Sequence, residues 1–174
     1  MSLDRDSTAV VVVDVQEGFR PVVLDFDDVA GNVARLVQGA NVLGVPVYAS
    51  EQYPQGLGPT VPEVAQHLNG VEPVPKVVFS AAEELDLRQH HQAIVCGIES
   101  HICVWQTARG LIEQGVEVHV ARDAVSSRTA ENRDLGIELI ERAGGAPTSV
   151  ETALFELLGA AGSDEFKQVQ RIIK

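Results

Sequence analysis

Two hydrophobic patterns alternate along the chain. The first consists of short runs of apolar and β-branched residues, which cover 8–13, 45–49, 74–79, 93–97 and 116–121. These runs are too apolar for strands with one solvated face, so they are typical of parallel strands buried on both faces. We therefore predict a strand over each of these ranges.

The second pattern places apolar residues three and four positions apart, which is the spacing of one helix face. Gly44 and Pro46 stop the first of these stretches, as expected at the end of a helix. Ser80 and Glu83 have the spacing of a capping box, which predicts the start of another helix. The predicted helices cover 29–43, 62–68, 80–91, 100–114, 131–143, 148–158 and 163–174.

Repeated strand-then-helix order favours parallel strands that are joined by right-handed crossovers. The predicted fold class is therefore α/β: a three-layer α/β/α arrangement with a mostly parallel, Rossmann-like open sheet. At 174 residues, the chain is expected to form one domain over 1–174. A loop rich in glycine and proline is predicted over 50–62, and loops of this length are often functional.

In such sheets, ligands bind at the carboxyl ends of the strands. Asp14 follows the first run, Lys76 lies within the run 74–79, and Cys103 comes after the run that begins at residue 93. With Ser100 as the N-cap, Cys103 falls in the first turn of a helix, where free N–H groups and the helix dipole favour a thiolate. The alternative is a buried cysteine that acts as a small hydrophobe, which is how we interpret Cys96.

A carboxylate, an ammonium group and a thiol at one sheet edge supply what amide cleavage requires. Lys76 is flanked by apolar residues in a covered strand, so its charge needs an anion. The carboxylate of Asp14 can take the thiol proton and return it to the leaving nitrogen. The thiolate of Cys103 can attack the carbonyl carbon, which divides one difficult step into two.

Composition narrows the choice of partners and compartment. The formal net charge of −12 argues against binding to nucleic acid or to an anionic membrane surface. No apolar segment approaches the roughly 20 residues of a membrane span, and two cysteines favour reduced thiols in the cytoplasm. The Gly-x-Gly-x-x-Gly and Gly-x-Ser-x-Gly motifs are absent, and the five histidines lack zinc-ligand spacing. We therefore expect a small-molecule substrate and a cytoplasmic location.

Four motifs occur in order along nearly the whole chain. They are VVVDVQ at 11–16, PKVVFS at 75–80, GIESHICV at 97–104 and DAVSS at 123–127. Together they resemble the isochorismatase-like cysteine hydrolase superfamily, which includes nicotinamidases and N-carbamoylsarcosine amidohydrolases. The loop after the second strand is similar to the subgroup of isochorismatase-domain-containing proteins, whose substrates are poorly defined.

The resemblance implies roles for individual residues. Asp14, Lys76 and Cys103 would form a catalytic triad, and the backbone N–H groups of Glu99 and Cys103 an oxyanion hole. It also implies a cis peptide between Ile98 and Glu99. Phe19 would be an aromatic wall of the substrate pocket, with Tyr53 as a further candidate pocket residue. Members are usually dimers or larger homo-oligomers, so we expect a homo-oligomer here.

The chain also departs from part of the superfamily. Nicotinamidases carry an Asp-x-His metal site after the second strand, and residues 49–60 contain no histidine, so we expect neither a catalytic metal nor another cofactor. The leading hypothesis is a metal-independent cysteine hydrolase that cleaves a C–N bond of a small amide, imide or carbamoyl compound through a thioester. One alternative is a catalytically weak protein that binds small molecules or proteins. Another is a redox sensor that uses Cys96 and Cys103.

Overall fold

A six-stranded sheet forms the centre of the protein, and all of its strand pairs are parallel. The structure is a computed structural model that describes residues 2–174. The strand order across the sheet is β3-β2-β1-β4-β5-β6. The strands are β1 (Thr8–Val13), β2 (Val47–Gln52), β3 (Val74–Lys76), β4 (Gln92–Ile98), β5 (Glu117–Ser126) and β6 (Ala146–Thr148).

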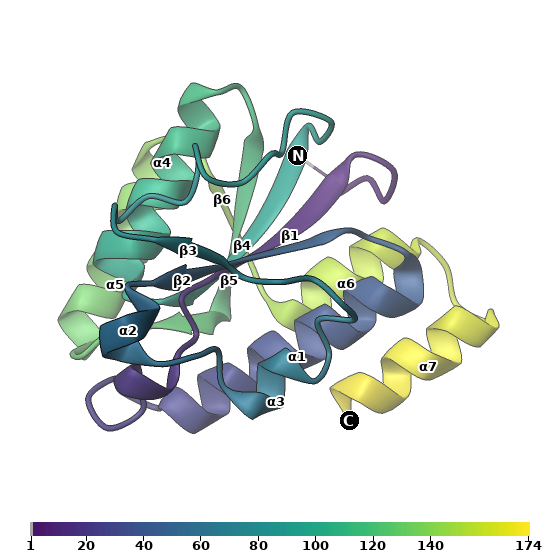
Figure 1. Cartoon of the computed structure of the whole chain (residues 1–174). Helices are drawn as coiled ribbons and strands as arrows, with labels where there is room; N and C mark the ends of the chain where they lie inside the picture. Colours follow the sequence, from purple (N-terminus) through teal and green to yellow (C-terminus); the bar gives the residue numbers. More distant parts are fainter. Residues whose placement is uncertain (1) are drawn as a thin grey trace.

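Helices cover both faces of this sheet (Figure 1). One layer contains α1 (Phe26–Leu43), α6 (Val150–Leu158) and α7 (Asp164–Ile173), with α3 (Pro62–Ala65) packed against α1. The opposite layer contains α4 (Trp105–Glu113) and α5 (Ala130–Arg142). The remaining short elements are η1 (Glu17–Phe19), α2 (Pro54–Leu57) and the π-helical segment η2 (Ser100–Val104). The predicted three-layer α/β/α fold class is confirmed.

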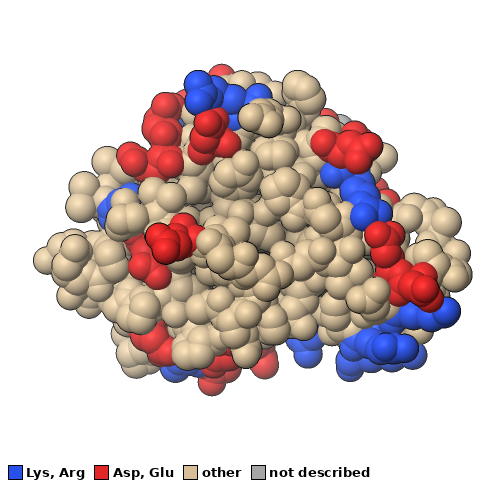
Figure 2. Space-filling model, turned by 45° about the vertical axis from the view of Figure 1, so that its right-hand side comes forward, with Lys and Arg blue, Asp and Glu red and all other residues tan. Residues whose placement is uncertain are grey.

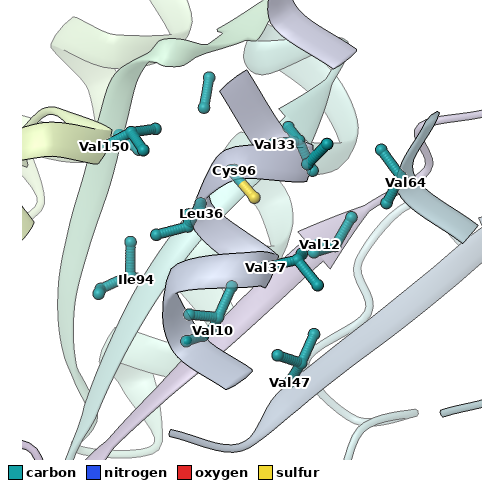
Figure 3. Close-up of a cluster of buried hydrophobic side chains, with 14 of the residues drawn as sticks. Val10, Val12, Val33, Leu36, Val37, Val47, Val64, Ile94, Cys96 and Val150 are labelled. Carbon is teal, nitrogen blue, oxygen red and sulfur yellow. The ribbon is translucent and has the colours of Figure 1, made fainter. Parts of the chain in front are cut away.

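The sheet separates two hydrophobic clusters because successive residues of a strand point to opposite faces. Val10 and Val12 pack with the α1 layer, whereas Val11 and Val13 pack with the α4 and α5 layer. Every residue of β1 is buried, as the unbroken apolar run predicted. Figure 3 shows the first cluster, in which α1 lies across the sheet. The labelled side chains are Val10, Val12, Val33, Leu36, Val37, Val47, Val64, Ile94, Cys96 and Val150.

The helix predicted over 80–91 is wrong. This stretch contains two short turns, in which the Leu85 N–H donates to the Ala81 carbonyl and the His90 N–H donates to the Leu87 carbonyl, and it is otherwise irregular up to β4. Leu85 and Leu87 are both buried in the second cluster. Two residues so close in sequence cannot lie on one helix face, so packing overrides the capping-box signal of Ser80 and Glu83.

Several predicted boundaries also differ in the structure. β2 begins later than predicted and continues to Gln52, so part of the loop predicted over 50–62 belongs to the sheet. β3 ends at Lys76, well before the predicted end at Phe79. β6 was not predicted, because it has only three residues and contains Pro147, which is tolerated at a sheet edge.

The packing between α1 and the sheet leads to a stability prediction. Leu36 is fully buried, and Leu36→Ala should lower the free energy of unfolding by about 2–5 kcal/mol because it leaves a cavity. Chemical denaturation followed by circular dichroism measures this change. The matched control is Leu135→Ala on the exposed side of α5, which should change stability by less than about 0.5 kcal/mol. Equal effects of the two substitutions would contradict the described core.

Candidate functional site

Asp14 is the first residue after β1, at the carboxyl edge of the sheet. Its backbone has φ of 55°, and its side chain is fully buried. The Ser50 hydroxyl donates to Asp14 Oδ1 at 2.7 Å, and the Lys76 ammonium donates to Oδ2 at 2.7 Å. Both carboxylate oxygens are therefore fixed by neighbours from other strands.

Lys76 ends β3, and its side chain is also fully buried. Besides Asp14, its ammonium donates to Gln52 Oε1 at 2.7 Å and to the Phe79 carbonyl at 3.0 Å. An ammonium group has three N–H donors, so these three acceptors satisfy it. The sequence-based expectation that the lysine must pair with an anion is confirmed by this buried ion pair.

Cys103 lies in η2, which follows β4 and leads directly into α4. The thiol is buried, and the residue packs in the second hydrophobic cluster. Ser100 was predicted to be the N-cap of this helix. In the structure, Glu99 occupies the N-cap position instead, and its side chain makes no capping hydrogen bond. The Ser100 hydroxyl lies 2.7 Å from the Ser127 hydroxyl instead, which ties η2 to the end of β5.

The pKa of the Cys103 thiol is raised to about 12. Burial is the largest cause, and the negative charge of Asp14 raises the pKa further, whereas the positive charge of Lys76 lowers it. The predicted thiolate at a helix N-terminus is therefore not favoured in the resting protein, because burial and the charge of Asp14 raise the pKa of the thiol. That Asp14, Lys76 and Cys103 act as a triad stays a prediction.

The predicted cis peptide between Ile98 and Glu99 is wrong. Among residues 2–174, the structure contains no cis peptide bond. The chain instead reverses through Glu99, which has φ of 59° and ψ of 63°. The Glu99 carboxylate accepts from Arg128 Nε at 2.9 Å, which gives this strained residue a fixed partner after β5.

Gly97 allows β1 and β4 to lie close together just before the site. A Cβ atom at this position would lie 2.0 Å from the Val13 carbonyl oxygen, and the backbone has φ of 132°. Only glycine is compatible with both conditions. The close contact places the ends of β1 and β4, and therefore Asp14 and the start of η2, side by side.

Three polar residues around the ion pair were not identified from the sequence: Ser50, Gln52 and Gln16. Gln52 and Gln16 are joined by two hydrogen bonds. The Gln52 N–H donates to Gln16 Oε1 at 2.7 Å, and Gln16 Nε2 donates to the Gln52 carbonyl at 3.0 Å. In the sequence, the only indication of a role for these two glutamines was their position near the ends of β1 and β2. A glutamine at such a position is not distinctive enough to predict a contact.

The two candidate pocket aromatics lie in different environments. Phe19 ends η1 and is partly buried against the first hydrophobic cluster. Tyr53 follows β2, and its N–H donates to the Lys76 carbonyl at 2.8 Å, while 54% of the residue is exposed. Contact of either ring with a substrate stays a prediction.

The two cysteines are free and belong to different hydrophobic clusters, Cys96 to the first and Cys103 to the second. The sheet between these clusters disfavours a disulfide, so the redox-sensor alternative loses its structural basis.

Among residues 2–174, no three His, Cys, Asp or Glu side chains converge as a metal site would require. A metal-free reaction stays a prediction.

Comparisons with known proteins agree with the fold and with this arrangement of motifs. The isochorismatase domain family matches residues 8–152. Isochorismatase domain-containing protein 2 of Danio rerio is 36% identical over 177 residues, which cover 98% of this chain and 89% of that protein. These similarities extend over nearly the whole chain.

Two solved structures are also similar. The MAR1 ribonuclease from Caenorhabditis elegans has a TM-score of 0.92 and 36% identity, covering 99% of this chain and 92% of that chain. The YcaC protein of Escherichia coli, described as an octameric hydrolase of unknown specificity, has a TM-score of 0.85 and 25% identity. That alignment covers 92% of this chain and 83% of the YcaC chain.

None of the helices in residues 2–174 has the length and apolar character that a membrane span requires.

The raised pKa predicts how the Cys103 thiol reacts. Only the thiolate is alkylated, so the reaction of Cys103 with iodoacetamide should be slow at pH 7 and should accelerate about tenfold per pH unit up to pH 10. Mass spectrometry of peptides that contain Cys96 or Cys103 measures the two rates separately. A rate that reaches its plateau below pH 8 would show a thiolate at neutral pH and would contradict the described environment.

Proposed function

The chain belongs to the isochorismatase domain family, and we propose that it is a metal-independent cysteine hydrolase. Its substrate would be a small amide, imide or carbamoyl compound, cleaved at a C–N bond. The observation that carries this proposal is the buried, hydrogen-bonded Asp14–Lys76 pair, whose charges act on the Cys103 thiol. These three groups supply a base, a cation and a nucleophile in one environment.

The first half of the reaction forms a thioester. Asp14 accepts the thiol proton as Cys103 Sγ attacks the carbonyl carbon of the substrate. The C–N bond then breaks, and Asp14 returns the proton to the leaving nitrogen. A thiol with a raised pKa suits this sequence, because its proton leaves only as the new S–C bond forms.

The second half releases the acid product. Asp14 accepts a proton from water as the water oxygen attacks the thioester carbonyl. The C–S bond breaks, and Asp14 returns the proton to Cys103. Lys76 stays protonated throughout. When Asp14 holds the proton, the negative charge lies on the carbonyl oxygen of the tetrahedral intermediate; when Asp14 gives the proton back, the charge returns to its carboxylate, which Lys76 stabilises.

Other parts of the site would bind the substrate. The backbone N–H groups of Glu99 and Cys103 would form the oxyanion hole, and each such donor contributes about 3 kcal/mol to transition-state stabilisation. Phe19 and Tyr53 would form the pocket walls. The metal-independent reaction is supported by Glu51 near the end of β2, because its Oε1 already accepts from the N–H and the hydroxyl of Thr60 at 2.6 and 2.7 Å.

Two other functions have less support. One relative is named a ribonuclease, but the net charge of −12 disfavours contact with a phosphate backbone. A protein that only binds ligands would not need a carboxylate and an ammonium group beside a buried thiol.

Because the proposed chemistry requires a free cysteine, we place the protein in a reducing compartment such as the cytoplasm.

Substitution of the nucleophile tests the proposed reaction. With small amides and ureides as substrates and released ammonia as the signal, Cys103→Ala should lower turnover by at least about a thousandfold, since the covalent route is lost. The fold should be unchanged, because alanine fits the space. Cys96→Ala on the other side of the sheet is the matched control and should keep its turnover. Full turnover by Cys103→Ala would eliminate the proposed mechanism.

We also propose that the chain forms a homo-oligomer through the face at the β3 edge. Four exposed apolar or aromatic residues lie there: Tyr53, Val77, Val78 and Phe79. Residues 43–82 contain only Glu51, Glu63, Glu72 and Lys76 as charged residues. Figure 2 likewise has a broad central area with few charged residues, and most of the red and blue atoms lie around its margin. Two copies of a chain with net charge −12 repel each other least through such a face.

A charge introduced on this face tests the assembly. Val77 is 78% exposed, and Val77→Glu should convert an oligomer into monomers because it would bury an unpaired carboxylate at the interface. Analytical ultracentrifugation measures the state. Leu135→Glu on α5 adds the same charge to another exposed apolar position and should leave the oligomer intact. A monomeric wild-type protein, or an unchanged Val77→Glu oligomer, would contradict the assignment of this face.

A further inference from the structure

Gln52 is the residue that connects the buried ammonium group to the rest of the protein. Its Oε1 accepts from Lys76 Nζ at 2.7 Å, the same distance as in the Asp14–Lys76 pair. Its Nε2 donates to the Val77 carbonyl at 3.0 Å. Both ends of the side-chain amide are therefore used, which fixes which end is oxygen and which is nitrogen.

The backbone of Gln52 is held just as firmly. Gln16 bonds to both its N–H and its carbonyl, and Gln16 Nε2 also donates to the Gly58 carbonyl at 2.8 Å. These contacts join the segment after β1, the end of β2 and the loop after α2. The side chain of Gln52 thus approaches Lys76 from a rigid support.

It matters that the acceptor Gln52 Oε1 is uncharged, because the Lys76 ammonium acts on two acidic groups. It neutralises the Asp14 carboxylate and lowers the pKa of the Cys103 thiol. The other acceptors around it, including the Phe79 carbonyl, are uncharged. Glu51, the residue next to Gln52, is bound to Thr60 instead. Asp14 is therefore the only carboxylate that is hydrogen-bonded to this ammonium among residues 2–174.

We propose that Gln52 is a positioning residue that holds Lys76 through a neutral acceptor and so reserves its positive charge for Asp14 and Cys103. The inference rests on the proposed cysteine hydrolase function. A carboxylate at position 52 would have nearly the same shape but would compete with Asp14 for the ammonium. Lys76 would then share its positive charge between two carboxylates and would stabilise the Cys103 thiolate less.

The substitution Gln52→Glu separates charge from shape. When protonated, the new side chain has a carbonyl oxygen for Lys76 and an O–H donor for the Val77 carbonyl, like the native amide. When ionised, it offsets the charge of Lys76 and raises the pKa of the Cys103 thiol. A rise of one pKa unit lowers the thiolate population about tenfold. The charged groups near this position are the Lys76 ammonium, which is bonded to it, the Asp14 carboxylate, which is bonded to the same ammonium, and the neighbouring Glu51 carboxylate, which is bonded to Thr60.

The experiment measures the reaction of Cys103 with dithiodipyridine, which remains reactive toward thiols at acidic pH. At pH 8, Gln52→Glu should react about tenfold more slowly than wild type, because the new carboxylate beside the ammonium is ionised and raises the pKa of the thiol. Gln52→Met removes the acceptor without adding charge, so its ratio to wild type should not change with pH. Gln66→Glu adds an exposed carboxylate at the C-terminal end of α3 and should match wild type.

A Gln52→Glu rate that equals the Gln52→Met rate at pH 8 would overturn the inference, because loss of the native amide alone would then explain the effect. The proposed function fails separately, when Cys103→Ala keeps its turnover of small amides. The two results are therefore distinguishable.

Discussion

The structure depends on one buried ion pair between Asp14 and Lys76. Removal of two such charges from water costs several kcal/mol per ion, and their attraction offsets this only when the remaining hydrogen-bonding positions are satisfied. Ser50, Gln52 and the Phe79 carbonyl satisfy them here. The ends of β1, β2 and β3 must therefore keep a fixed register, because a shift of any one would leave a buried charge unpaired.

The same pair sets the state of the nearby thiol. Asp14 and Lys76 together are neutral, so the Cys103 thiol experiences little net attraction for its negative form, and burial raises its pKa. A protonated thiol is also less open to oxidation and to unintended alkylation. In the proposed reaction, the substrate carbonyl makes removal of the thiol proton favourable, since a new bond from carbon to sulfur replaces the lost S–H bond.

The sequence predicted the parts of the site that depend on strand order, and it failed where distant polar contacts decide. The apolar run that ends at Asp14 was sufficient to place this residue at the carboxyl edge of the sheet. Lys76 was predicted inside a strand over 74–79, and its need for an anion followed from its apolar surroundings. The contacts of Gln52 join segments 24 to 36 residues apart, and no local pattern marks them. The thiol pKa was predicted with the wrong sign, because the helix-dipole argument omitted burial and the charge of Asp14. The helix over 80–91 failed because the burial of Leu85 and Leu87 overrode a local cap signal.

Gly97 shows how the backbone and the chemistry constrain each other. Val13 and Gly97 are direct partners in the β1–β4 pair, and a side chain at Gly97 would overlap the Val13 carbonyl. Any substitution would therefore separate the strands one residue before Asp14 and shortly before η2. In the proposed reaction, Cys103 would act through short-range contact with Asp14, so a small displacement there would remove proton transfer even with the core intact. At this sheet edge, the proposed site would therefore add a constraint on mutation to the one that the packing of the two helical layers imposes.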